Sequence, residues 1–142
     1  MRPKKKMNEC IFCKIINKEI PSNIIYEDDK TLAFLDNHPV NNGHTIVISK
    51  KHFENILDLE KSYLNACFET VQKISKAVKE GVNAEGFNIL MNNLKASGQV
   101  IFHTHIHIIP RFENDGLKLW GGKDYNPGEN LKILNSIKSK IQ

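Results

Sequence analysis

The sequence lacks any long hydrophobic run. Its longest apolar stretches, residues 46–48 and 106–110 among them, are far shorter than the roughly 20 residues that a membrane-spanning helix needs. The basic start is not followed by the apolar segment of a secretory signal peptide. We therefore expect a cytoplasmic protein with no membrane partner.

Cysteine is scarce, with three residues in a chain that shows no export signal. An odd number in that context argues against a disulfide framework. Cys10 and Cys13 form a Cys-x-x-Cys pair, for which metal binding or redox chemistry is the first interpretation and two reduced thiols in a short helix the alternative. Cys67 falls within an amphipathic helical pattern and is expected to be buried as a small apolar residue.

The body of the chain carries no excess charge of either sign. Four of the 20 basic residues, Arg2, Lys4, Lys5 and Lys6, lie at the start, and removing them leaves 16 basic against 16 acidic residues. A short basic segment is typical of a solvated terminus, so nucleic-acid binding is not expected. We predict a disordered tail over residues 1–8 and a single domain over 9–142, with a C-terminal extension from about residue 112.

Hydrophobic periodicity predicts an α+β fold. Apolar residues recur at threes and fours over 10–17, 58–81 and 128–141, which indicates a short first helix, one long helix and a terminal helix. Runs rich in β-branched residues predict five strands, at 24–26, 31–35, 44–49, 87–92 and 100–110. Because strands follow one another with one long helix between them, an antiparallel five-stranded sheet covered by that helix is favoured over a parallel sheet.

Three of the six histidines lie in the segment His103-Thr104-His105-Ile106-His107. In a strand, residues two apart share a face, so all three imidazoles are expected on one side. Imidazole serves both metal binding and catalysis near neutral pH. Alternate residues lie about 6.5–7 Å apart along a strand, which disfavours convergence of all three rings on one ion. The spacing alone leaves both chemistries open.

This segment, followed by two apolar residues, resembles the motif of the histidine triad family. The similarity extends through Cys-Ile-Phe-Cys-Lys-Ile-Ile at 10–16, Ala-Phe-Leu-Asp at 33–36, Gly-His-Thr at 43–45, Lys-Lys-His at 50–52 and Gly-Gln at 98–99. The chain is similar to the Hint-type branch. That resemblance implies the family fold, a homodimer, no organic cofactor and hydrolysis of purine nucleoside phosphoramidates, with a nucleotide of AMP or GMP type as ligand.

The resemblance also implies catalytic roles. His105 corresponds to the family nucleophile, which forms a covalent nucleotidyl-histidine that water hydrolyses, and neutral imidazole is a competent nucleophile near neutral pH. His107 corresponds to a residue that stabilises charge on the phosphate oxygens. His103, the third catalytic candidate, is open between a hydrogen bond within the site and metal ligation.

Further residues match nucleotide-binding positions of the family. Asp36 resembles the carboxylate that accepts hydrogen bonds from both ribose hydroxyls. Positions near the phosphate are matched by Asn92, Gln99 and Val100, where Val100 replaces a serine found in many Hint-type members. The match puts the base in an apolar slot made by Ile11, Phe12, Ile15, Phe34 and Ile46, although each of these is also a plausible core residue.

The resemblance completes a candidate zinc site. Some relatives hold a Cys-Cys-His-His zinc, and the matching residues here are Cys10, Cys13, His52 and His103. Four protein ligands leave no open coordination position, so this zinc is expected to be structural.

Other interpretations stay open at this stage. Trp120 is expected either to reach a partner subunit's site, as C-terminal segments do in related dimers, or to pack on the surface. A Fhit-type hydrolase of dinucleoside polyphosphates shares the same triad, and a nucleotide-binding scaffold module with incidental hydrolysis is the alternative from another class.

Overall fold

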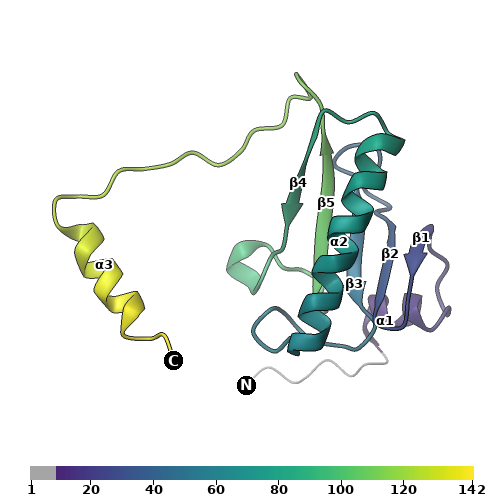
Figure 1. Ribbon diagram of the computed structural model, residues 1–142, viewed down its shortest axis with the longest axis horizontal. Coiled ribbons are helices and arrows are strands. Elements are labelled where there is room, and N and C mark those ends of the chain that lie inside the picture. Colours follow the sequence, from purple (N-terminus) through teal and green to yellow (C-terminus); the bar gives the residue numbers. More distant parts are fainter. Residues whose placement is uncertain (1–8) are drawn as a thin grey trace.

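The computed structural model describes residues 9–142, and the predicted disordered tail at 1–8 lies outside the described residues. The chain forms, in order, α1 (Ile11–Ile16), β1 (Ile24–Glu27), β2 (Thr31–Leu35), β3 (Thr45–Ser49), α2 (Lys61–Gly81), β4 (Gly86–Leu90), the 3₁₀ turn η2 (Lys95–Ser97), β5 (His105–Arg111) and α3 (Glu129–Lys138) (Figure 1). None of the helices in this described part has the length and hydrophobicity required to span a bilayer.

The five strands form one sheet in the order β1-β2-β3-β5-β4, and every neighbouring pair is antiparallel. The α+β class, the five-stranded antiparallel sheet and the single long helix predicted from periodicity are therefore confirmed. β5 is inserted between β3 and β4, which places the histidine-bearing strand inside the sheet and leaves β4 at an edge.

The sheet separates two hydrophobic layers. α2 lies across one face (Figure 1), and its Cys67, Val71 and Ile74 pack on Val47 and the apolar residues of β5. Cys67 is fully buried, as predicted. The opposite face packs against α1. The buried residues of this second cluster are Cys10, Phe12, Cys13, Ile15, Leu32, Phe34, Ile46 and Ile48.

For three elements of the sheet and its covering helix, predicted boundaries were wrong by two residues or more. α2 begins at Lys61 rather than 58, because the Asp58 carboxylate accepts hydrogen bonds from the backbone N–H groups of Glu54 and Asn55 and so belongs to the preceding turn. β4 covers 86–90 rather than 87–92. β5 begins at His105 rather than 100, because the backbone N–H of Thr104 donates to the Phe53 carbonyl instead of to a neighbouring strand.

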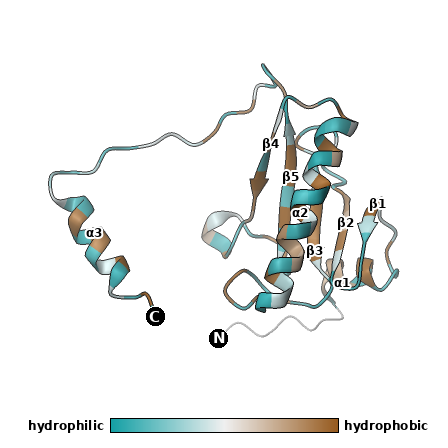
Figure 2. Cartoon of the chain, in the orientation of Figure 1, coloured by the Kyte–Doolittle hydropathy of each residue, from teal (hydrophilic) through white to brown (hydrophobic). Residues whose placement is uncertain are grey.

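The C-terminal extension leaves the body at the end of β5. It runs past the β4 edge as an extended segment and ends in α3, which lies away from the sheet and α2 (Figure 1). Hydropathy colouring shows apolar residues along α3 although the helix packs on neither layer (Figure 2).

Candidate functional site

His105 and His107 lie on the α1 face of the sheet, within β5. His105 pairs with Ile48 of β3, and His107 pairs with Ile46 of β3 and with Leu90 of β4. Their rings are edge to face, with centroids 5.0 Å apart. His103 precedes the strand, but its ring also lies on the α1 side, where Phe12 contacts it with centroids 5.8 Å apart.

The His105 ring is held in one tautomer. Its Nδ1 lies 2.7 Å from the carbonyl oxygen of His103, and a carbonyl can only accept, so Nδ1 carries the hydrogen and Nε2 keeps its lone pair. Burial lowers the pKa of His105 below that of a free imidazole. Phe12 packs against the ring, with centroids 5.1 Å apart. The buried imidazole therefore presents a neutral, basic Nε2.

A second pair of rings fixes the tautomer of His107. The backbone N–H of Val40 donates to Nδ1 of His44, at 3.1 Å, so the neutral His44 carries its hydrogen on Nε2. That Nε2 lies 2.8 Å from Nδ1 of His107, which must accept, and His107 therefore carries its own hydrogen on Nε2. Burial, with His105 and His44 nearby, lowers the pKa of His107 to about 4. His107 is thus a neutral donor beside the His105 ring.

Asp36 follows β2 and lies close to this pair. Its Oδ2 is 3.7 Å from Nε2 of His44, and its Oδ1 accepts a hydrogen bond from the backbone N–H of His38. The backbone N–H of Asp36 donates to the carbonyl of His44, which ties the end of β2 to the start of β3. A carboxylate is therefore fixed at the same end of the sheet as His107.

Cys10, Cys13, His52 and His103 come together beside α1. Nδ1 of His103 lies 3.4 Å from Sγ of Cys10 and 3.6 Å from Sγ of Cys13, and Nδ1 of His52 lies 3.4 Å from Sγ of Cys13 and 3.2 Å from Nδ1 of His103. In a tetrahedral zinc site, two nitrogen ligands lie about 3.3 Å apart and a nitrogen and a sulfur about 3.6 Å apart, given the usual metal–ligand lengths. The four residues therefore fit a zinc ion.

The orientation of the His103 ring also fits a metal ion. Nε2 of the fully buried His103 lies 2.7 Å from the Ser49 carbonyl, so Nε2 carries the hydrogen and Nδ1 directs its lone pair toward the two sulfurs. Burial, with the neighbouring Cys10, raises the pKa of the Cys13 thiol to about 12, so this thiol keeps its proton until a metal displaces it. A second cluster, Asp36, His44 and His107, fits zinc less well because its two ring nitrogens, 2.8 Å apart, are already at hydrogen-bond distance.

The apolar residues predicted to hold a base are largely gathered in one place. Phe12, Ile15, Phe34 and Ile46 are buried in the cluster under α1, and Phe12 joins this cluster to the His105 ring. Ile11 lies on the exposed side of α1, with 45% of its surface accessible.

The loop after β4 offers only some of the phosphate-binding groups that were predicted for it. The Gln99 side chain is buried, and both amide hydrogens are used, in bonds to the carbonyls of Glu54 and Ile101. The backbone N–H groups of Gly98 and Gln99 also bond within the loop. Gln99 therefore shapes the loop, while Asn92 packs beside Gly98 and Val100 is 82% exposed.

His44 is the site residue that sequence reasoning missed, because the Gly-His-Thr match at 43–45 gave it no chemical role. The predicted strands offered a signal. If the strands at 44–49 and 100–110 are antiparallel neighbours, the first residue of one lies near the last residues of the other. The structure shows this register, in which Thr45 pairs with Ile108.

Comparisons with known proteins agree with this architecture. The HIT domain family model matches residues 17–114. An uncharacterised HIT-like protein of Borreliella burgdorferi is 46% identical over 84% of this chain and 88% of its own. The adenylylsulfatase HINT3 of Arabidopsis thaliana is 46% identical over 78% of this chain and 56% of its own. The adenosine 5'-monophosphoramidase HNT1 of Candida albicans is 40% identical over 72% and 70%.

Solved structures show the same fold. The SMU.412c protein of Streptococcus mutans superposes with a TM-score of 0.90 at 36% identity, over 98% of this chain and 89% of its own. A zinc-bound histidine triad protein of Mycobacterium smegmatis superposes with a TM-score of 0.75 at 34% identity, over 94% and 99%. With the family model matching most of the chain and the paired histidines on β5, this chain belongs to the HIT domain family and is of the Hint type.

Proposed function

We propose that this protein hydrolyses purine nucleoside 5'-phosphoramidates, or closely related nucleoside 5'-phosphate derivatives, with His105 as the nucleophile. The observation that carries the proposal is the bond from Nδ1–H of His105 to the His103 carbonyl, which leaves a neutral Nε2 with its lone pair. Relatives named as an adenylylsulfatase and an adenosine 5'-monophosphoramidase support a nucleotide hydrolase.

The reaction has two displacements at phosphorus. Nε2 of His105 attacks, the bond from phosphorus to the leaving amine breaks, and the amine nitrogen takes up a proton from solvent and departs. Water then attacks the nucleotidyl-histidine, the bond from phosphorus to Nε2 breaks, and the attacking water returns a proton to solvent. The products are a nucleoside monophosphate and an amine, and His105 is neutral again.

His107 is placed to assist both displacements. Its Nε2–H, oriented by His44, is a donor on the same face as His105 and stabilises charge on the phosphate oxygens. In this proposal the ribose lies on Asp36 and the base in the slot beside Phe12, while Asn92 and the exposed Val100 border the phosphate.

The proposal is tested by trapping the intermediate. The protein is mixed with an excess of adenosine 5'-phosphoramidate, quenched early and digested, and the peptide containing residues 103–107 is analysed by mass spectrometry. We expect an adenylate adduct on His105 that disappears as substrate is exhausted. Direct attack by water predicts an unmodified peptide at every time.

A substrate comparison separates the proposal from its alternatives. Initial rates are measured with adenosine 5'-phosphoramidate, adenosine 5'-phosphosulfate and a diadenosine polyphosphate. Fastest turnover of the diadenosine compound would favour the Fhit-type hydrolase, and binding of all three without turnover would favour a scaffold module.

Replacing Asp36 with asparagine is expected to weaken ribose recognition. A hydrogen bond to a charged group contributes about 1.5–3 kcal/mol, so KM for the phosphoramidate should rise about tenfold or more with a smaller change in kcat. The same measurement with a 2',3'-dideoxy substrate is the control, because that substrate offers no hydroxyl to Asp36. A KM increase of equal size for both substrates contradicts the ribose assignment.

The pH profile should lack an inflection where free histidine titrates. Burial is the largest of the effects that lower the pKa of His107 to about 4; the neighbouring His105 and His44 also lower it, and Asp36 opposes the shift. The ring therefore stays neutral as the pH falls through the usual histidine pKa of about 6.5. We expect kcat/KM to be flat across that range, measured in buffers of constant ionic strength. A decrease centred on the free-imidazole pKa contradicts this picture.

We further propose that Cys10, Cys13, His52 and His103 hold one structural zinc. The proposal is supported by their spacing, by the orientation of His103 and by the zinc-bound relative of Mycobacterium smegmatis. A cytoplasmic location, which remains a prediction, would keep both cysteines reduced. Because His103 also accepts the hydrogen bond from His105, zinc here would brace the backbone that orients the nucleophile.

A homodimer of single-domain chains completes the proposal. β4 is an edge strand, and Phe87 and Ile89 on it are exposed together with Phe68 of α2. These three residues line an apolar groove of about 860 Å³ between β4 and α2, in which the buried Ser75 hydroxyl has no hydrogen-bond partner within residues 9–142. Exposed edges and apolar grooves of this kind favour pairing with a second copy.

A further inference from the structure

The proposed nucleoside site lies on one side of β5. Phe34 belongs to β2, Asp36 follows β2 and Ile46 belongs to β3, and both strands precede β5 in the order of the sheet. β4 lies on the other side of β5. In a displacement at phosphorus the attacking and leaving atoms are roughly in line. Because His105 attacks from the sheet and the nucleoside extends toward β2, the space left for the leaving amine lies toward β4.

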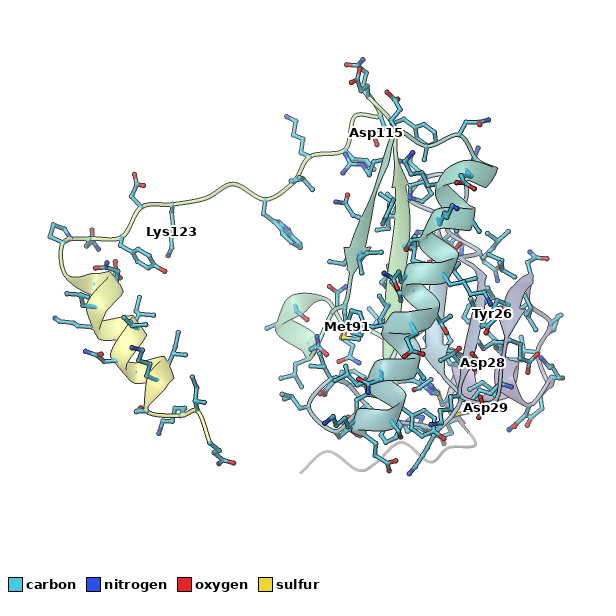
Figure 3. All side chains as sticks on the ribbon, viewed as in Figure 1. Tyr26, Asp28, Asp29, Met91, Asp115 and Lys123 are labelled. Atoms are coloured by element: carbon cyan, nitrogen blue, oxygen red, sulfur yellow. The ribbon has the colours of Figure 1, made fainter. Side chains whose placement is uncertain are left out.

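The chain that follows β4 runs beside the nucleophile. Leu90, the last residue of β4, pairs with His107. Met91, labelled in Figure 3, packs with the apolar layer under α2. Because side chains alternate along an extended chain, Asn92 turns back to the face that carries His105. The loop after β4 therefore borders His105 on the side toward which the leaving amine extends.

Leu94, in this loop, has a backbone conformation that is almost confined to glycine, with φ 70° and ψ 162°. Its N–H donates to Oε1 of Gln99 at 2.7 Å, and its carbonyl accepts from the backbone N–H of Ser97 at 3.2 Å. The Gln99 amide is held in turn by the carbonyls of Glu54 and Ile101. The loop thus maintains a strained leucine that is 51% exposed, and strain of this kind is typical of functional sites.

Two further exposed apolar side chains accompany Leu94. Val100, in the same loop, is 82% exposed. Leu57, in the loop before α2, is 80% exposed, and its neighbour Ile56 donates its backbone N–H to Oδ1 of Asn93 at 2.9 Å. This bond joins the two loops at the end of the sheet where β5 begins (Figure 1). We call Leu57, Leu94 and Val100 the apolar rim.

We propose that the apolar rim binds the leaving group, so that the preferred substrates are nucleoside phosphoramidates of apolar amines. The rim lies on the β4 side of His105, and exposed apolar surface beside a site favours an apolar ligand. Full burial of one methylene corresponds to about a fourfold gain in affinity, and an open surface that covers half of it gives about twofold. The inference rests on the proposed hydrolysis and specifies the chemical class of its leaving group.

A series of leaving groups tests the proposal. Initial rates are measured with adenosine 5'-phosphoramidates of ethylamine, butylamine and hexylamine, which have nearly the same basicity and differ in apolar area. We expect kcat/KM to rise about twofold per methylene, or about 16-fold from ethylamine to hexylamine. The 6-aminohexanoate compound, which ends in a carboxylate, should have a kcat/KM about tenfold below that of hexylamine. Equal kcat/KM across the series overturns the proposal, whereas no hydrolysis of any member overturns the proposed function.

Leu94→Gly separates the side chain from the backbone. Glycine relieves the strained φ, so the melting temperature should rise by about 2–4 °C, while the ratio of kcat/KM for hexylamine over ethylamine should fall about threefold or more. A purely structural leucine predicts the higher melting temperature with an unchanged ratio, which would contradict the proposal.

Matched variants complete the test. Asn83→Gly also replaces a residue at positive φ, 53°, beyond the far end of α2, and should keep the wild-type ratio. Leu57→Ser should lower the ratio without the gain in melting temperature. A ratio that is kept in Leu94→Gly and lost in Trp120→Ala would place the leaving group on the C-terminal extension and overturn the proposal.

Discussion

Replacing His105 with alanine is expected to lower kcat for adenosine 5'-phosphoramidate by at least about 10³-fold, because a covalent route cannot operate without its nucleophile. The adenylate adduct that we expect for wild type should also be absent. AMP should still bind, as measured by calorimetry, because the Asp36 carboxylate and the apolar slot beside Phe12 remain.

The control for this experiment is His38→Ala. His38 is an exposed histidine in the loop after Asp36, and its backbone N–H, which bonds to the Asp36 carboxylate, is kept by alanine. We expect this variant to have the kcat of wild type. If His105→Ala hydrolyses the phosphoramidate at more than a tenth of the wild-type rate, His105 is not the nucleophile.

Replacing both Cys10 and Cys13 with serine is expected to remove zinc and to lower the melting temperature by about 10–15 °C. A bound ligand at about 1,000 times its dissociation constant contributes about 4 kcal/mol of folding free energy, and each kcal/mol corresponds to about 2–4 °C or more for a domain of this size. Elemental analysis and calorimetry measure the two effects. The loss of zinc should also reduce kcat, because His103, a proposed zinc ligand, supplies the carbonyl that orients His105.

Cys67→Ala is the matched control for the metal. Cys67 belongs to α2, on the other face of the sheet, so this change should lower stability through a smaller side chain without altering the zinc content. Wild-type protein that contains no zinc after expression in zinc-supplemented medium, or a double serine variant that retains it, contradicts the assignment.

The outline of the fold could be read from local patterns. Alternation and helical periodicity predicted the five strands and the long helix, because each element must turn an apolar face toward the core. The ends of the helices and strands were harder to predict from the sequence. Val100 and Ile101 have strand-forming side chains, yet the Ile101 carbonyl accepts a bond from the neighbouring Gln99 amide. The backbone N–H of Thr104 donates to Phe53, which is distant in sequence.

In the candidate site, too, local sequence patterns predicted some features, and contacts between distant residues decided the others. The alternating histidines predicted that β5 holds catalytic or metal-binding residues. The motif match identified Asp36 and the proposed zinc ligands as further candidates. The sequence did not reveal that His44 orients His107, or that the Gln99 amide is used within its own loop. Hydrogen bonds of this kind depend on which strands become neighbours and on the register between them.

By itself, the sequence determined which residues can do chemistry: imidazoles at alternate positions, a Cys-x-x-Cys pair and a carboxylate after a buried strand. Only the tertiary structure decided how these are divided, with His103 turned to the cysteines and His105 and His107 left on the strand. The physical reason is that the tautomers of two of these rings are set by groups far away in sequence, by the Ser49 carbonyl for His103 and by the His44 ring for His107. Those contacts form only when β3 and β5 pair.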